Sequence, residues 1–427
     1  MTSFINLTLG VALAASMLLL SFKMGHARFM NVRRSELIVV LFAVISRGSD
    51  AQQPIPSPQA GQEQNRQAIT PIGAMTTARF DQIFGDLMNR EHVPGLAVAV
   101  ARNGIVDWDK AYGRADLETG ASATSRTLFR IGSITKAITA VAILQLADRG
   151  KIDLDASVDQ YVPAFPRKRF PVTLAGLLSG TSGIRGYAGD EYRSNHHYAS
   201  LAASLEMFRD DSLAYEPGTS YLETPFGFTL LGLSLQAVTG LSYEEYLSRN
   251  VFVPAHMIDT KVDVPAQIVR GRAHMYTRDS SGTVHQADAI DPSYKVPAGG
   301  LLSTARDVAH FGAALIGGAL LSPRSYGRMS RPVHLQNGSD LPLGMGVALG
   351  NAGGRLLGSA DAIWATGLQQ GGTAVLLMYP HDRIVVAVLM NMNGESGADG
   401  FGLLRRAAVA AESAAVQRRQ IQGDTKQ

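Results

Sequence analysis

Hydrophobic positions in the first folded part of the chain follow a helical spacing and then a strand-like spacing. Apolar side chains recur at helical intervals over residues 78–90, which predicts a first helix. Residues 96–101 and 105–112 have strand-like patterns, and the Asn103-Gly104 pair between them favours a tight turn. The pattern therefore predicts a helix followed by a β-hairpin.

The C-terminal end of the chain mirrors this arrangement. Residues 373–378 and 384–391 are β-rich runs joined by a turn at residues 380–383, and an Ala-rich helical pattern follows over residues 402–417. The long stretch between the two ends has helical patterns and many loops but no obvious series of strands. Strands from both ends around a mostly helical middle predict an α+β fold, with an antiparallel sheet flanked by helices and an added helical domain.

These patterns also predict how the chain divides. One domain is expected over residues 78–415, followed by a tail at residues 416–427. Within the domain, the sheet part is assigned to residues 78–116 and 290–415, and the helical insert to residues 117–289.

The N-terminal region carries two apolar stretches. Residues 4–22 have no charge and are long enough to be considered as a membrane span. A second, ten-residue apolar run at 37–46 follows Arg33-Arg34 and precedes Ser49-Asp50-Ala51, which resembles a cleavage site with small residues. These features predict a signal peptide over residues 30–51.

Export follows from this interpretation. Residues 1–51 form a signal or anchor region, and the Gln- and Pro-rich residues 52–77 form a flexible linker. Residues 1–29 are either upstream of the true start codon or an additional anchor. We therefore expect a periplasmic or secreted protein, with a membrane-anchored form as the alternative.

Composition narrows the chemistry. The 427 residues are 46% hydrophobic and 18% charged, which permits a large buried core. The chain has no cysteine, which excludes thiol nucleophiles, disulfides and cysteine-ligated metals. A net charge of +3 without a basic block gives little support for nucleic-acid binding, so no nucleic-acid partner is expected. The ten histidines form no cluster with metal-ligand spacing, so neither a metal nor another cofactor is expected.

The strongest candidate for chemistry is a serine followed three residues later by a lysine. Ser133 and Lys136 open an apolar helical pattern that continues to about Arg149 and stops at Gly150. Residues three apart share a helix face, and the helix N-terminus favours a developing anion. A partly desolvated lysine can then act as the base for the serine. The plainer alternative is that Ser133 only caps the helix and that Lys136 is solvated.

The surrounding segments resemble the serine β-lactamase-like family, which includes class C β-lactamases, penicillin-binding proteins and family VIII esterases. The resemblance is collinear over about residues 78–412 and includes Leu128-Phe129-Arg130-Ile131-Gly132, Leu177-Leu178-Ser179-Gly180-Thr181-Ser182-Gly183, Phe226-Gly227-Phe228-Thr229-Leu230-Leu231-Gly232 and Pro297-Ala298-Gly299-Gly300-Leu301-Leu302-Ser303-Thr304. It implies a β-lactamase/transpeptidase-like fold and an acyl-enzyme formed on Ser133.

The second motif of the family, Tyr-x-Asn, is altered in this chain. Counting back from Phe226, its positions hold Glu223, Thr224 and Pro225. A carboxylate therefore stands where the resemblance implies a catalytic tyrosine, and a proline stands where an asparagine would bind a substrate amide. Glu223 is either a base beside Lys136 or an exposed turn residue. Tyr221 stands two residues upstream and faces the same way on an extended segment, which makes it a substrate-binding candidate.

The third motif, usually Lys-Thr-Gly or His-Thr-Gly, is Ala365-Thr366-Gly367 in this chain. The resemblance implies that the backbone N–H of Leu368 pairs with that of Ser133 as an oxyanion hole, and that Thr366 and Gly367 bind substrate. The cation of the motif is missing. Relatives also have a histidine at the position of Gly180.

We therefore expect an exported serine hydrolase that acts on an ester, an amide or a peptide, with catalytic residues Ser133, Lys136 and Glu223. Weak or absent β-lactamase activity is expected, because the missing asparagine and cation are the groups that would hold an acylamino carboxylate. The alternative is a catalytically impaired member that binds a cell-wall peptide or a protein partner.

Overall fold

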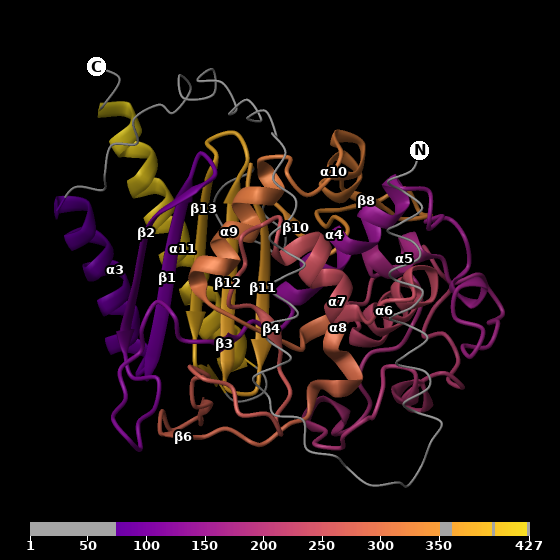
Figure 1. The fold of residues 1–427 in the computed structure, drawn as a ribbon, viewed down its shortest axis with the longest axis horizontal. Coiled ribbons are helices and arrows are strands. Elements are labelled where there is room, and N and C mark those ends of the chain that lie inside the picture. Colours follow the sequence, from indigo (N-terminus) through magenta and orange to yellow (C-terminus); the bar gives the residue numbers. More distant parts are fainter. Residues whose placement is uncertain (1–73, 351–360, 395–397, 425–427) are drawn as a thin grey trace, which may run out of the picture. The chain divides into compact units, whose positions relative to one another are not determined.

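The computed structural model describes residues 74–350, 361–394 and 398–424 (Figure 1). The predicted signal peptide, the anchor and most of the linker lie outside the described residues. Within them, no single helix is long and apolar enough to cross a membrane. The bent pair Pro225–Thr239 and Tyr243–Phe252 meets the length and composition requirement only when its two helices are taken together.

A six-stranded antiparallel sheet forms the centre of the sheet part, with strand order β10-β11-β12-β13-β1-β2. The N-terminal hairpin thus joins the C-terminal strands through the β1–β13 pair, as the pattern predicts. The strands are β1 (Gly95–Arg102), β2 (Ile105–Gly113), β10 (Ala348–Leu349), β11 (Ile363–Gln369), β12 (Gly372–Tyr379) and β13 (Ile384–Met390).

The hairpin turn and the alternating strands follow directly from the sequence. Asn103 and Gly104 both have positive φ angles, of 51° and 87°, which the two-residue turns favoured in β-hairpins accommodate. Side chains alternate along β1, so its odd and even positions enter two different hydrophobic clusters. Both faces of the sheet are therefore buried, and both need covering helices.

Helices cover the two faces of the sheet (Figure 1). The helices α3 (Ala74–Glu91) and α11 (Ala398–Asp424) pack together, and α11 lies against β12 and β13. The helix α9 (Ala305–Ile316) packs against β1, β12 and β13 from the other side, within the other cluster. The predicted α+β class is confirmed.

A helical part lies beside the sheet (Figure 1). Its α-helices are α4 (Ile134–Asp148), α5 (Leu174–Ser179), α6 (Pro225–Thr239), α7 (Tyr243–Leu247), α8 (Val296–Gly299) and α10 (Pro323–Met329). Its short helical turns are η2 (Val158–Gln160), η3 (Glu191–Arg193), η4 (Ala203–Met207), η5 (Ser248–Phe252) and η6 (Pro292–Lys295). The helices α4, α6 and α8 pack against one another, and α4 also contacts β11 and β12, so α4 joins the two parts.

Short strands make three small sheets, including two in the middle region where the sequence shows no strand series. The small sheets have the orders β14-β5-β6, β3-β7-β4 and β8-β9. Their strands are β3 (Phe129–Arg130), β4 (Lys261–Val262), β5 (Tyr276–Arg278), β6 (Val284–Gln286), β7 (Leu301–Ser303), β8 (Val333–His334), β9 (Asp340–Leu341) and β14 (Met392–Gly394). Strands of two or three residues are too short to show a periodicity.

Both terminal helices extend beyond their predicted bounds. The helix α3 begins at Ala74, inside the predicted linker 52–77, where Ala74 and Met75 are strong helix formers. The helix α11 continues to Asp424, so most of the predicted tail 416–427 is helical. In this last part of α11 one contact with the sheet is a buried ion pair between Arg418 and Asp107 instead of apolar packing.

Candidate active site

The local structure around Ser133 presents its hydroxyl instead of using it as a helix cap. Ser133 occupies the N-cap position of α4, with φ −66° and ψ −5°, and its side chain makes no capping hydrogen bond. The preceding Gly132 has φ +49°, a left-handed conformation that favours glycine. The turn thus directs the chain from β3 into α4 and leaves the serine at the positive end of the helix. The plain capping role is not what the geometry shows.

Lys136 is buried one turn into α4 and pairs with Glu223. The residue is 7% exposed, its Nζ lies 5.6 Å from the centre of the Phe228 ring, and it donates a hydrogen bond to Glu223 Oε1. The charge of Lys136 lowers the pKa of Glu223 against the opposing effect of burial. The Glu223 side chain remains 52% exposed, so it is both a partner of the lysine and accessible to solvent.

The position of Glu223 is set by the start of α6. Thr224 is the N-cap residue, and its hydroxyl accepts a hydrogen bond from the backbone N–H of Phe226 and donates one to Arg185 O. Pro225 occupies the first helical position, where its missing N–H costs nothing and its fixed φ favours the helix. The start of α6 therefore explains why a proline is tolerated at this position. Its side chain offers no hydrogen bond to a ligand.

The predicted oxyanion-hole strand packs directly against the backbone before Ser133. A Cβ atom added to Gly367 would lie 1.9 Å from Ile131 O and 3.1 Å from Ser133 N, and one added to Gly132 would lie 2.9 Å from Leu368 N. Only glycine permits this close approach. The backbone N–H groups of Ser133 and Leu368 thus lie at the same junction, as an oxyanion hole requires.

A cavity of about 180 Å³ brings most of the predicted site residues together. Five of them line it: Ser133, Lys136, Tyr221, Glu223 and Thr366. Gly367 and Leu368 contact the site through the backbone and are not part of the lining. Most of the remaining wall is apolar: Leu177, Leu178, Phe228, Leu343, Val347, Ala348, Trp364 and Ala365. The only charged side chains in the described lining are the paired Lys136 and Glu223.

A second buried lysine near this site was missed by the sequence analysis. Lys295 is 4% exposed, and its Nζ lies 3.3 Å from the Tyr187 hydroxyl. Its ammonium lies 5.1–5.5 Å from the centres of three tyrosine rings: Tyr187, Tyr192 and Tyr294. In the described part of the chain, no carboxylate forms an ion pair with it. Burial, together with the charges of Arg130 and Lys136, lowers the pKa of Lys295 to about 7. No local sequence signal marks this residue, because its cage is assembled from distant segments.

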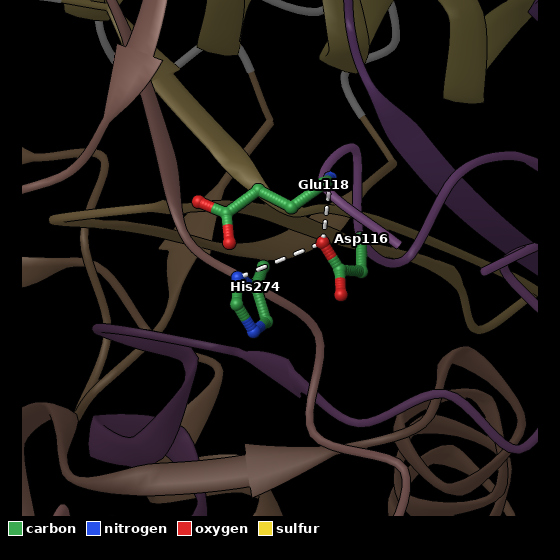
Figure 2. Close-up of side chains that lie close together, drawn as sticks. All are labelled: Asp116, Glu118 and His274. Atoms are coloured by element: carbon green, nitrogen blue, oxygen red, sulfur yellow. Dashed lines mark hydrogen bonds and ion pairs between the residues drawn. The ribbon is translucent and has the colours of Figure 1, made fainter. Parts of the chain in front are cut away.

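A potential metal-binding group lies outside the cavity. Figure 2 shows Asp116, Glu118 and His274, whose ligand atoms lie within 4.8 Å of one another. The Asp116 carboxylate already accepts hydrogen bonds from the Glu118 N–H at 2.8 Å and the Thr119 hydroxyl at 2.5 Å. These contacts stabilise a turn and explain the grouping without an ion. The expectation that no metal is needed stays a prediction.

Comparison with known proteins gives the family. The β-lactamase family model matches residues 80–411. The chain belongs to the β-lactamase family. It is 28% identical over 294 residues to the human serine β-lactamase-like protein LACTB, mitochondrial, covering 53% of this chain and 54% of that protein. It is 26% identical over 322 residues to protein flp of Staphylococcus aureus strain N315, covering 74% and 63%. The chain thus spans about half to two thirds of the length of these relatives.

Solved structures confirm the fold expected for this family. A penicillin-binding protein from Bacillus halodurans is 25% identical with a TM-score of 0.63, covering 78% of this chain and 98% of that one. D-amino acid amidase from Ochrobactrum anthropi SV3 is 20% identical with a TM-score of 0.69, covering 82% and 100%. The β-lactamase/transpeptidase-like architecture inferred from the sequence is therefore present.

Proposed function

We propose that the protein is a serine hydrolase that cleaves an uncharged ester or amide through an acyl-enzyme on Ser133. The observation that carries the proposal is the cavity, in which Ser133 lies beside the Lys136–Glu223 pair. Membership of the β-lactamase family, together with the amidase and penicillin-binding folds of the neighbours, supports hydrolysis in general. The particular groups at the altered motifs support the assignment to uncharged substrates.

The ion pair offers a route for the serine proton. As Ser133 Oγ attacks the substrate carbonyl, Lys136 donates a proton to Glu223 and takes the hydroxyl proton in its place. The pair then carries one additional proton, which it returns to the leaving alcohol or amine. The backbone N–H groups of Ser133 and Leu368 stabilise the negative charge on the former carbonyl oxygen. Water subsequently attacks the acyl carbonyl with Glu223 accepting its proton, and the pair returns that proton to Ser133 Oγ as the carboxylic acid product leaves.

The walls favour an uncharged acyl group. Ala365 in the wall supplies no cation, and Lys136 is already neutralised by Glu223. Pro225, at the start of α6, supplies no amide. A substrate carboxylate placed in this cavity would lose its hydration without gaining a partner. An apolar acyl chain would instead lie against Leu177, Phe228 and Trp364.

A panel of nitrophenyl esters tests this proposal. A neutral short-chain acyl ester should be hydrolysed, while an otherwise matched ester with a terminal carboxylate and a chromogenic cephalosporin should react poorly. Ser133→Ala should abolish turnover. Ser179→Ala is the matched control, because Ser179 lines the same cavity but its hydroxyl bonds to Ala175 O at 2.8 Å. Equal turnover by Ser133→Ala and wild type would contradict the proposal. Binding of peptide without turnover would favour the impaired, ligand-binding alternative.

Export remains a separate proposal based on the N-terminal sequence. Arg33-Arg34, the apolar run at residues 37–46 and Ala51 support a cleaved signal peptide. N-terminal sequencing of the mature protein should find an end near Gln52. An intact Met1 in cytosolic protein would contradict export.

A further inference from the structure

The ring of Tyr221 occupies the space that a side chain at position 180 would need. Gly180 ends α5 in a left-handed conformation, with φ +73°. A Cβ atom added there would lie 2.6 Å from Tyr221 Cε2 and 2.9 Å from Cδ2, which is closer than real contacts of this kind. The absence of a side chain at Gly180 is therefore a condition for the observed position of the tyrosine.

Backbone contacts hold the same two segments together. The N–H of Leu222 donates a hydrogen bond to Gly180 O at 2.9 Å, and the hydroxyl of Tyr215 donates another to the same oxygen at 2.9 Å. Leu222 lies between Tyr221 and Glu223, so these two hydrogen bonds fix the backbone of that segment relative to α5. Tyr221 is 36% exposed, and its side chain lines the cavity.

Tyr221 and Glu223 stand two residues apart in the chain and line the same cavity. Burial first, and then the charge of Glu223, raise the pKa of Tyr221, so the hydroxyl keeps its proton at neutral pH. The Tyr221 hydroxyl adds to the larger effect of Lys136 in lowering the pKa of the Glu223 carboxyl. The groups that act on the Glu223 carboxyl are therefore Lys136 from α4 and Tyr221 from its own segment, and Tyr215 acts on Tyr221 in turn.

We propose that Tyr221 is a positioning residue admitted by Gly180, whose hydroxyl holds the Glu223 carboxylate in place against Lys136. A glutamate side chain has three rotatable bonds, and Glu223 is half exposed, so the lysine alone leaves it freedom to swing into solvent. A second contact from a partly buried ring restricts the carboxylate to the orientation that receives a proton from Lys136. The proposal rests on the proposed hydrolysis and deepens it.

Tyr221→Phe tests the hydroxyl while keeping the ring on Gly180. The variant should lower kcat on a neutral ester about tenfold, the factor that one hydrogen bond to a charged group is worth, with little change in KM. The Glu223 carboxyl, followed by ¹³C NMR and assigned with Glu223→Gln, should titrate at higher pH than in wild type. A purely structural role would not move this titration.

Gly180→Ala tests the space for the ring. Its Cβ should displace Tyr221 and reproduce both the loss in kcat and the shift in the Glu223 titration. Gly240→Ala is the matched control, because Gly240 also ends a helix with a left-handed φ of +68° but has nothing within 4 Å of an added Cβ. It imposes similar backbone strain and should leave kcat and the titration unchanged. The double variant Gly180→Ala/Tyr221→Phe should lose no more kcat than either single variant.

The two proposals fail in different ways. A wild-type kcat in Tyr221→Phe together with an unchanged Glu223 titration would overturn the role of Tyr221. Equal effects of Gly180→Ala and Gly240→Ala would also overturn it, because strain alone would then explain the loss. Wild-type protein that hydrolyses no ester, but whose Glu223 titration still shifts in Tyr221→Phe, would reject the hydrolysis and retain the contact.

Discussion

Lys295 should destabilise the folded protein at neutral pH. Its ammonium is buried among three tyrosines, and in the described part of the chain no carboxylate neutralises it. Methionine has a similar length and an unbranched, apolar side chain, so Lys295→Met removes the titrating group while keeping most of the packing. The variant should unfold at a higher urea concentration than wild type at pH 7.

The magnitude follows from the pKa. Burial, with Arg130 and Lys136, lowers the pKa of Lys295 from 10.5 to about 7. The folded value lies below the unfolded one, so between these two pH values the unfolded chain holds more protons and stability rises with pH. At pH 7 the lysine therefore costs on the order of 4 kcal/mol relative to a neutral side chain, and near pH 9.5 the cost falls to about 1 kcal/mol.

Urea unfolding of both proteins at pH 7 and pH 9.5 measures this difference. The gain in the free energy of unfolding that Lys295→Met gives over wild type should be large at pH 7 and smaller at pH 9.5. Lys151→Met, at an exposed lysine, is the matched control and should change stability little at either pH. A Lys295→Met protein that is less stable than wild type at pH 7, or an advantage that does not depend on pH, would refute the reasoning.

Two further variants test the catalytic groups. Glu223→Gln should lower kcat by roughly 10²–10⁴-fold and should remove the acid limb of the pH–rate profile. In wild type the midpoint of that limb should lie below the ordinary pKa of glutamate, because Lys136 lowers the pKa of Glu223. Full activity in Glu223→Gln would reduce Glu223 to a turn residue. Gly367→Ala would place a Cβ 1.9 Å from Ile131 O, so it should separate β11 from Ser133 and lower kcat by roughly 10²–10³-fold. The melting temperature of the variant serves as the control for folding. A wild-type kcat in the folded variant would contradict the assignment of the oxyanion hole.

Local patterns predicted the parts of the fold that local residues determine. The Asn103-Gly104 turn has the positive φ angles that its residue types favour, and α4 ends just before Gly150, which also has a positive φ. The α+β class followed from strands at both ends of the chain. The end of α11 was misjudged because Arg418 reads as polar in sequence, whereas its ion pair with Asp107 buries it.

The candidate site could be predicted only where a motif carries it. The resemblance aligned Ser133, Lys136 and Glu223, and the structure places all three around one cavity, while their catalytic roles stay predictions. The contact of Tyr221 with Gly180 joins residues 41 positions apart, and no local pattern encodes it. The cage around Lys295 is likewise a product of tertiary packing.

A covalent adduct on Ser133 tests the central claim most directly. Purified protein should be treated with a fluorophosphonate, and its intact mass should then be measured and its peptides mapped. We expect one added phosphonyl group on Ser133, formed by displacement of fluoride, and no such adduct in Ser133→Ala. An unmodified wild-type protein that is folded, or an adduct that persists in Ser133→Ala, would contradict it.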